Sequence, residues 1–133
     1  MRTIDEIRQR LTKYPNVKYE VKGNTLTVFP TSDDGFEVAI YYGDNEEEFS
    51  VFFAGWHEEF SSRDEALNCF AFGLSPECRL RECRRGDTAY KWTVEYREDG
   101  GWVSDSTTSL ILFPFWRTKE ERYLQNTLVR EEG

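Results

Sequence analysis

Hydrophobic and polar residues alternate along much of residues 17–54, a period of two that is typical of half-buried β-strands. Short turn segments that contain Gly, Asp and Asn divide this stretch into four predicted strands. The strands are expected at residues 17–22, 25–29, 36–42 and 48–54. We therefore predict an antiparallel meander in this part of the chain, with Gly23-Asn24 as its first tight turn.

Helical spacing replaces the alternation on both sides of the meander. Near the start of the chain, Thr3 and Glu6 fit the pattern of a capping box that opens a helix. After the meander, Ser62 and Glu65 fit a second capping box. The helix that they open reaches Gly73 and is apolar on nearly all sides, which predicts a central position in the fold.

Three further strands are predicted in the second half of the chain, at residues 78–84, 88–97 and 102–113. The segment Asp99-Gly100-Gly101 joins the last two and is the strongest hairpin signal in the sequence. Thr118 and Glu121 then fit a third capping box, which predicts a C-terminal helix through Leu124 and Leu128.

The predicted order α-ββββ-α-βββ-α describes a single α+β domain over residues 1–133, with a mostly antiparallel sheet packed against helices. Only 38% of the residues are hydrophobic, but 16% are aromatic, and large rings bury much area in a core. The formal net charge is -8 at pH 7. Because affinity for nucleic acid comes mainly from Lys and Arg on phosphates, we expect no nucleic-acid partner.

The sequence predicts a cytoplasmic protein. No apolar segment of the signal-peptide kind opens the chain. The longest apolar run, from Leu110 to Trp116, is far shorter than the roughly 20 residues that span a bilayer, and we expect no membrane partner. Cys69, Cys78 and Cys83 are odd in number and follow no framework spacing, which favours free thiols in a reducing compartment.

The residue types present disfavour most catalytic and cofactor chemistry. His57 is the only histidine, so metal sites with two histidines are excluded. The cysteines form no C-x-x-C pair and the chain has no glycine-rich phosphate loop, so we expect neither a metal nor a cofactor. His57 is expected in a loop between a strand and a helix, where a solvated residue is favoured over a general base.

Two groups of residues that flank the fourth predicted strand form the candidate binding site. They are Asp44, Glu46, Glu47 and Glu48 at the start of the strand, and Trp56, His57, Glu58 and Glu59 after it. An acidic surface of this kind attracts a basic partner and raises its association rate by electrostatic steering. In a simple meander the two groups lie at opposite ends of the strand, so the sequence does not predict a shared patch.

A second candidate site is an aromatic pocket on the last predicted hairpin. Tyr90, Trp92 and Tyr96 alternate along one strand, and Asp105 lies among hydroxyl residues of the other. These groups could line a small-molecule or enzymatic pocket, but a core face on one strand and a hydroxylated outer face on the other is favoured.

Three arginines, at positions 79, 81 and 85, occupy one face of a predicted strand. They could bind an anion, but such a stripe more commonly forms ion pairs across strands. We predict pairing with acids such as Glu95.

Three sequence blocks, at residues 65–75, 90–96 and 113–116, resemble a bacterial family of small acidic proteins with no assigned activity. The resemblance implies no catalytic residues. In element order the chain is also similar to type III secretion chaperones, and in size and charge to immunity proteins of bacterial toxin systems.

We therefore expect a non-enzymatic binding module of the bacterial cytoplasm that holds a basic protein partner. The first version is an immunity-type inhibitor of a basic toxin, and the second is a secretion-chaperone-like protein. A small-molecule-binding or enzymatic domain, using the aromatic pocket with Asp105, is the third.

Overall fold

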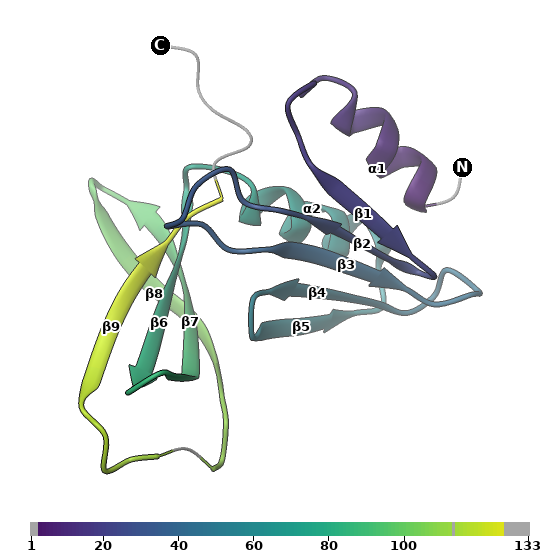
Figure 1. Ribbon diagram of the computed structural model, residues 1–133. Helices are drawn as coiled ribbons and strands as arrows, with labels where there is room; N and C mark the ends of the chain where they lie inside the picture. The colour runs from purple at the N-terminus through teal and green to yellow at the C-terminus, as the bar shows by residue number, and fades with distance from the viewer. Residues whose placement is uncertain (1–2, 113, 127–133) are drawn as a thin grey trace.

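The computed structural model describes residues 3–112 and 114–126, which form two helices and nine strands in two antiparallel sheets (Figure 1). In chain order the elements are α1 (Thr3–Leu11), β1 (Tyr19–Lys22), β2 (Thr25–Val28), β3 (Val38–Tyr42), β4 (Phe49–Phe53), β5 (Trp56–Phe60), α2 (Arg63–Gly73), β6 (Cys78–Arg85), β7 (Thr88–Glu98), β8 (Gly101–Ser109) and β9 (Lys119–Leu124). The N-terminal sheet has the strand order β1-β2-β3-β4-β5, and the C-terminal sheet has the order β8-β7-β6-β9. The chain is therefore mixed α and β, but over the described residues it contains more strands and fewer helices than predicted.

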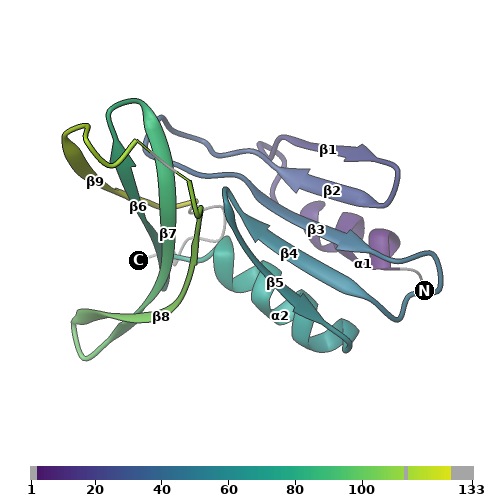
Figure 2. The ribbon, with the colours of Figure 1, turned by 90° about the horizontal axis from the view of Figure 1, so that it is seen from below.

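Both helices cover one face of the N-terminal sheet (Figure 2). The register aligns the alternating apolar residues of the meander, since Ile40 lies opposite Leu26 on one side and Val51 on the other. The residues that α2 buries against this face are Ala66, Leu67, Phe70 and Gly73. The other side of α2 faces solvent at Asn68 and Ala71. The prediction that this helix is central rather than at the surface is therefore wrong, because small or polar residues occupy its outer face.

The strand β5 replaces the predicted loop between the meander and α2. The turn before it places Ala54 at a φ of 53°, a left-handed conformation that alanine rarely adopts and that the sequence does not signal. β5 pairs antiparallel with β4, and Trp56 lies opposite Phe53. The prediction that His57 lies in a connecting loop is therefore wrong. Pairing with β4 satisfies backbone groups that a loop would leave to water.

The strand β9 replaces the predicted C-terminal helix. It pairs antiparallel with β6, with Glu121 opposite Cys83. Without this pairing, β6 would present a row of unpaired backbone N–H and C=O groups at a sheet edge. The hydrogen bonds that this segment gains by pairing with β6 outweigh the helix preference indicated by Thr118 and Glu121. The last apolar residue of the predicted helix, Leu128, lies outside the described residues.

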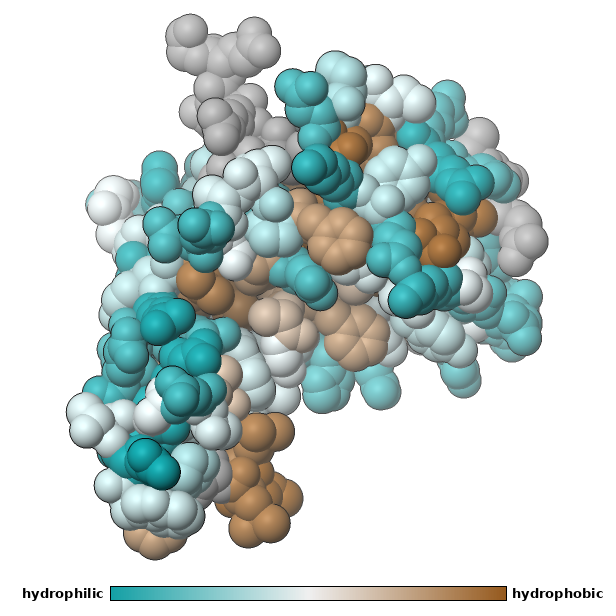
Figure 3. Space-filling model, in the orientation of Figure 1, coloured by the Kyte–Doolittle hydropathy of each residue, from teal (hydrophilic) through white to brown (hydrophobic). Residues whose placement is uncertain are grey.

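The strand β8 ends at Ser109, whereas the sequence predicted a strand as far as residue 113. A connection over residues 110–118 follows, and its apolar side chains protrude at the lower end of the C-terminal sheet (Figure 3). Residue 113 itself lies outside the described residues. The bounds of the other predicted strands agree with the structure to within two residues.

The turn between β4 and β5 packs directly on the C-terminal sheet. A Cβ on Gly55 would lie 2.4 Å from Cε2 of Trp92, so this approach requires glycine. Next to it, the Trp56 ring stacks on Phe53 with a centroid distance of 4.7 Å, and Trp56 Nε1 donates to Ser106 Oγ at 3.0 Å. Buried residues of both sheets belong to one continuous core around this turn.

The loop between β3 and β4 holds the first turn of α1. The Glu46 carboxylate accepts hydrogen bonds from the backbone N–H of Thr3 at 2.6 Å and from its Oγ1 at 2.9 Å. Thr3 is fully buried, and a carboxylate at a helix N-terminus also interacts favourably with the helix dipole. The predicted local capping box is therefore wrong, and Glu6 instead forms salt bridges with Arg10 and Arg63.

We predict that Gly55→Ala lowers the free energy of unfolding by about 1–3 kcal/mol, because the added methyl group overlaps the Trp92 ring. Urea unfolding followed by circular dichroism measures the loss. Gly101→Ala is the matched control, since its Cβ would meet only the Glu98 carbonyl oxygen, at 3.7 Å. The control should not lower stability, and equal stability of the two variants would contradict the close contact.

We also predict that Glu46→Ala lowers the free energy of unfolding by about 1.5–3 kcal/mol, because two buried donors of Thr3 lose their charged acceptor. Glu47→Ala, in the same loop but with an exposed side chain, should change it by less than about 0.5 kcal/mol. The same urea titration compares the two variants. A Glu46→Ala variant as stable as Glu47→Ala would mean that this loop does not anchor α1.

Candidate acidic binding site

Part of each predicted acidic group meets at one end of the N-terminal sheet. Because β5 runs back along β4, Glu59 lies opposite Ser50, which in turn lies opposite Tyr41 on β3. The end of β5 therefore returns to the loop that carries Glu47 and Glu48. These side chains line an open hollow of about 460 Å³. Its full lining is Tyr41, Glu47, Glu48, Phe49, Ser50, Glu59, Phe60 and Ser61, and we call it the acidic hollow.

Within the part of the chain that the structure describes, the three carboxylates of the acidic hollow have no ion-pair partner. Among the described residues, no Lys or Arg forms a salt bridge with Glu47, Glu48 or Glu59. The surrounding charge adds to theirs, since residues 3–77 contain six Lys and Arg against fifteen Asp and Glu. Closely spaced negative charges in a concave surface produce a strong local field, so the hollow is suited to a cationic group.

The other residues of the predicted site do not line the hollow. Glu46 caps α1, and the Asp44 carboxylate accepts a hydrogen bond from the side-chain amide of Asn24. Glu58 lies opposite Val51, on the face of the sheet that the helices cover. Of the predicted binding residues, Glu46 and Asp44 therefore accept hydrogen bonds within the protein, and Glu58 lies on another face than the acidic hollow.

The two aromatic residues of the predicted site lie at the far end of β5. Trp56 is 3% exposed and belongs to the core, so a partner on the surface does not reach its ring. His57 is exposed on the opposite face, with its ring 6.0 Å from that of Phe52. Among the described residues the His57 imidazole forms no hydrogen bond, so no carboxylate orients it as a general base.

The rings of the predicted aromatic pocket are mostly buried. Tyr90 and Trp92 are buried, and Trp92 Nε1 donates to the Glu82 carboxylate at 3.3 Å. Tyr96 lies on the same strand face and is half-buried. Asp105 is exposed, at the point where the register of β7 and β8 shifts by one residue. Two of the three rings are therefore buried, and that of Trp92 belongs to the continuous core.

The predicted pairing of the arginine stripe with Glu95 is confirmed for two of its members. Glu95 is only 4% exposed, and its carboxylate lies 2.6 Å from Arg79 Nε and 3.8 Å from Arg81 Nη1. The Arg79 guanidinium also lies between the rings of Trp102 and Tyr123, at 4.6 and 4.2 Å from their centroids. Both rings come from other strands, so sequence spacing gives no signal of this arrangement.

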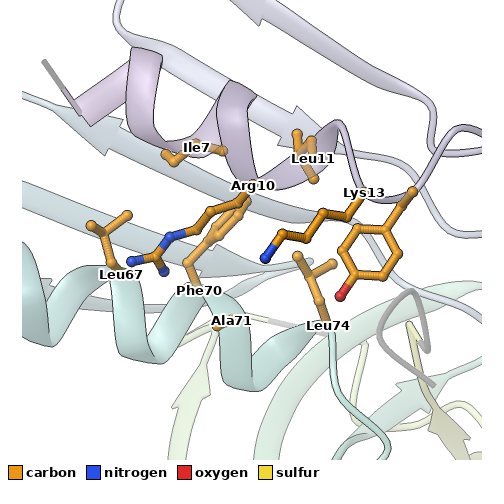
Figure 4. A pocket seen from close by; sticks show the side chains of 9 residues that line it. Ile7, Arg10, Leu11, Lys13, Leu67, Phe70, Ala71 and Leu74 are labelled. Atoms are coloured by element: carbon orange, nitrogen blue, oxygen red, sulfur yellow. The ribbon is translucent and has the colours of Figure 1, made fainter. Parts of the chain in front are cut away.

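A second hollow, about 190 Å³ in volume, lies between α1 and α2 (Figure 4). Its apolar lining is Ile7, Leu11, Leu67, Phe70, Ala71 and Leu74. Arg10, Lys13 and Tyr14 complete it, with both basic side chains reaching into the space between the helices. Its volume is below the roughly 300 Å³ at which ligand pockets usually begin, so it suits a single apolar side chain rather than a cofactor.

Two of the three cysteine thiols, those of Cys69 and Cys78, are protected from ionisation. Burial, with the Glu58 and Asp105 carboxylates as smaller causes, raises the pKa of Cys69 from 9.0 to about 12. Burial also raises the pKa of Cys78. Since the thiolate is the reactive form, these positions do not favour a nucleophile. Over residues 3–112 and 114–126, no three His, Cys, Asp or Glu side chains are close enough together to hold a metal ion.

In the described part of the chain, neither helix has the length and apolar character to cross a membrane.

No protein-family model, curated protein or solved structure matches this chain. The resemblance to a bacterial family of small acidic proteins therefore stays a prediction.

We predict that Cys69 in the folded protein reacts with iodoacetamide at pH 8 about 1000-fold more slowly than an ordinary thiol. Raising the pKa from 9.0 to about 12 lowers the thiolate fraction by that factor. Mass spectrometry of the peptide that contains Cys69 measures the rate. The same reaction in concentrated urea is the control, and there the rate should be that of an ordinary thiol. Rapid labelling of the folded protein would contradict the raised pKa.

Proposed function

We propose that the protein is a non-enzymatic module that binds a basic protein through the acidic hollow, as an immunity-type inhibitor of a basic toxin in the bacterial cytoplasm. The observation that carries the proposal is the meeting of Glu47, Glu48 and Glu59 in one hollow, where no Lys or Arg of the described residues forms a salt bridge with them. Repulsion among these carboxylates contributes nothing to the fold, whereas a cationic partner would relieve it.

A Lys or Arg of the partner is the group that best fits this hollow. Carboxylates bind a guanidinium with short, charge-assisted hydrogen bonds, often in pairs. Tyr41 is 38% exposed and lies beside Glu59 across β4, so its ring can cover the alkyl part of the inserted side chain. The acidic N-terminal half supplies the longer-range field that steers the partner toward the hollow.

The site chemistry supports binding over catalysis. The sole histidine lies at the other end of β5, exposed and without an orienting carboxylate among the described residues. The pKa values of Cys69 and Cys78 are raised, which removes nucleophilic character at neutral pH. In the alternative aromatic pocket, Tyr90 and Trp92 are buried, which leaves little of their rings for a ligand to contact.

The secretion-chaperone version of the proposal differs in the state of its partner. A chaperone of this kind holds an extended segment, whereas an inhibitor holds a folded protein. The apolar hollow between α1 and α2 favours the chaperone version, because it can take one apolar side chain of an extended segment. The acidic hollow serves either partner, so the two versions are separated by experiment.

We predict that the triple variant Glu47→Gln, Glu48→Gln and Glu59→Gln binds the basic partner with a lower association rate and a flatter dependence on salt. Loss of charge at the rim of an interface acts mainly on the encounter rate, and we expect a decrease of about tenfold. Glu46 is left unchanged because it caps α1. The partner is first captured by the immobilised wild-type protein from a lysate of the source organism, and its association is then measured by stopped-flow fluorescence.

The control variant carries the same change of charge elsewhere on the N-terminal half: Glu37→Gln, Glu65→Gln and Glu77→Gln. These side chains are exposed and accept no hydrogen bond from another described residue. The control should retain the partner with nearly the wild-type rate. Equal association rates of the two triple variants would overturn the assignment of the acidic hollow.

Hydrogen exchange of the captured partner separates the two versions. A partner that is protected throughout, and whose toxic activity falls when it is bound, supports the inhibitor. A partner that is protected only over one extended segment supports the chaperone.

A further inference from the structure

The connection between β8 and β9 passes around the end of the C-terminal sheet, from one sheet edge to the other (Figure 1). Both of its ends are fixed to the sheet. Leu110 N donates to the Tyr90 carbonyl at 2.7 Å, and Thr118 O accepts from Gly86 N at 3.1 Å. The connection is therefore held in place at the tip of the β6–β7 hairpin.

Between these fixed ends the connection exposes large apolar side chains. Ile111 is 94% exposed and Leu112 is 87% exposed, while Phe115 and Trp116 are 70% and 71% exposed. With Leu110 they form a surface that we call the apolar loop, visible as the protruding hydrophobic group in Figure 3. Apolar residues gathered on a protein surface mark a site of contact with another molecule or with a membrane.

Basic residues outnumber acidic ones around the apolar loop, in contrast to the N-terminal half of the chain. Residues 84–91 and 109–121 contain five Lys and Arg against one Asp and two Glu, and Lys119 lies 3.7 Å from one of these, Glu121, whereas residues 3–77 have nine more acidic than basic residues. The Arg85 guanidinium donates to the Arg117 carbonyl at 3.3 Å, which places its charge beside the loop. The end of the C-terminal sheet is therefore apolar and has a small excess of basic charge, and the excess of acidic charge lies on the other half of the chain.

We propose that the apolar loop inserts into the interface of an anionic lipid bilayer, with Arg85, Arg117 and Lys119 near the phosphates. Trp and Phe favour the headgroup level of a bilayer, and apolar insertion combined with basic charge is the usual requirement for stable attachment. The sequence predicts no membrane partner because the run is too short to span a bilayer, but insertion at the interface needs no such length.

The separation of charge also sets the orientation of the bound molecule. The negative surface of an anionic bilayer attracts the basic end and repels the acidic N-terminal half. The acidic hollow would therefore face the solution and remain open to its basic partner. A groove on an acidic protein could also accept the apolar loop, but a convex, aromatic and basic-flanked loop matches the bilayer interface more closely.

The test is co-sedimentation of the full chain with vesicles made of equal parts phosphatidylcholine and phosphatidylglycerol. We expect the wild-type protein to bind these vesicles and to bind phosphatidylcholine vesicles more than tenfold less. The double variant Phe115→Ser and Trp116→Ser should lose binding by a similar factor. Tyr19→Ser with Val103→Ser is the matched control, since it removes exposed apolar side chains outside the loop and should bind as the wild type does.

A second measurement locates the insertion at the loop itself. On anionic vesicles the tryptophan emission of the wild type should shift to shorter wavelength, because Trp116 leaves water. Trp116→Phe should still bind but should lose most of the shift, and Arg117→Gln with Lys119→Gln should weaken binding to anionic vesicles only. An unchanged shift in Trp116→Phe would place the membrane contact elsewhere and overturn the proposal.

Two further outcomes would also overturn it. Equal binding of neutral and anionic vesicles would exclude the role of the basic residues. A wild-type protein that binds no vesicles but forms a dimer in sedimentation velocity, which Phe115→Ser with Trp116→Ser converts to a monomer, would make the loop an interface between two copies. The Gln variant of the acidic hollow should bind vesicles normally, so this test fails or succeeds independently of the proposed partner.

Discussion

Close contact between the β4–β5 turn and the C-terminal sheet is the constraint on which the arrangement of the molecule depends. Gly55 lies against the Trp92 ring, and Gly73 of α2 lies against Phe53, so that a Cβ at either glycine would approach ring atoms to within 2.4 Å. Aromatic rings fill the space that the missing side chains leave. Through these contacts the two sheets and α2 share one core, although the sheets exchange no strands.

The same packing separates two kinds of surface. The N-terminal sheet packs one face against the helices and buries most of its apolar residues there. Polar and acidic groups lie at its end and, together with Tyr41 and Phe52, on its other face. The C-terminal sheet places arginines on its outer face, where a buried carboxylate and two rings hold Arg79. Excess negative charge therefore collects on one half of the chain and exposed apolar surface at the far end of the other.

The two proposed binding surfaces lie in different regions of the protein, and each is suited to a different partner. The acidic hollow is suited to a basic protein, and the apolar loop is suited to an anionic bilayer interface. Because each surface is repelled by what attracts the other, neither should compete with the other for its partner. A module with these two surfaces would hold a basic protein close to a membrane.

The sequence by itself determined most of the strands, the position of α2 and the excess of acidic charge, because alternation and turn residues are local properties. Tertiary structure decided the rest. Residues 119–124 became β9 because an open edge of β6 was available, and Ala54 formed a turn that only the pairing of β5 with β4 makes favourable. Likewise, the Glu46 carboxylate caps α1, which is distant in sequence, and does not line the acidic hollow. Glu59 lines the hollow together with Glu47 and Glu48. Such outcomes depend on which chain segments become neighbours in space, and that information lies in the whole core rather than in any single segment.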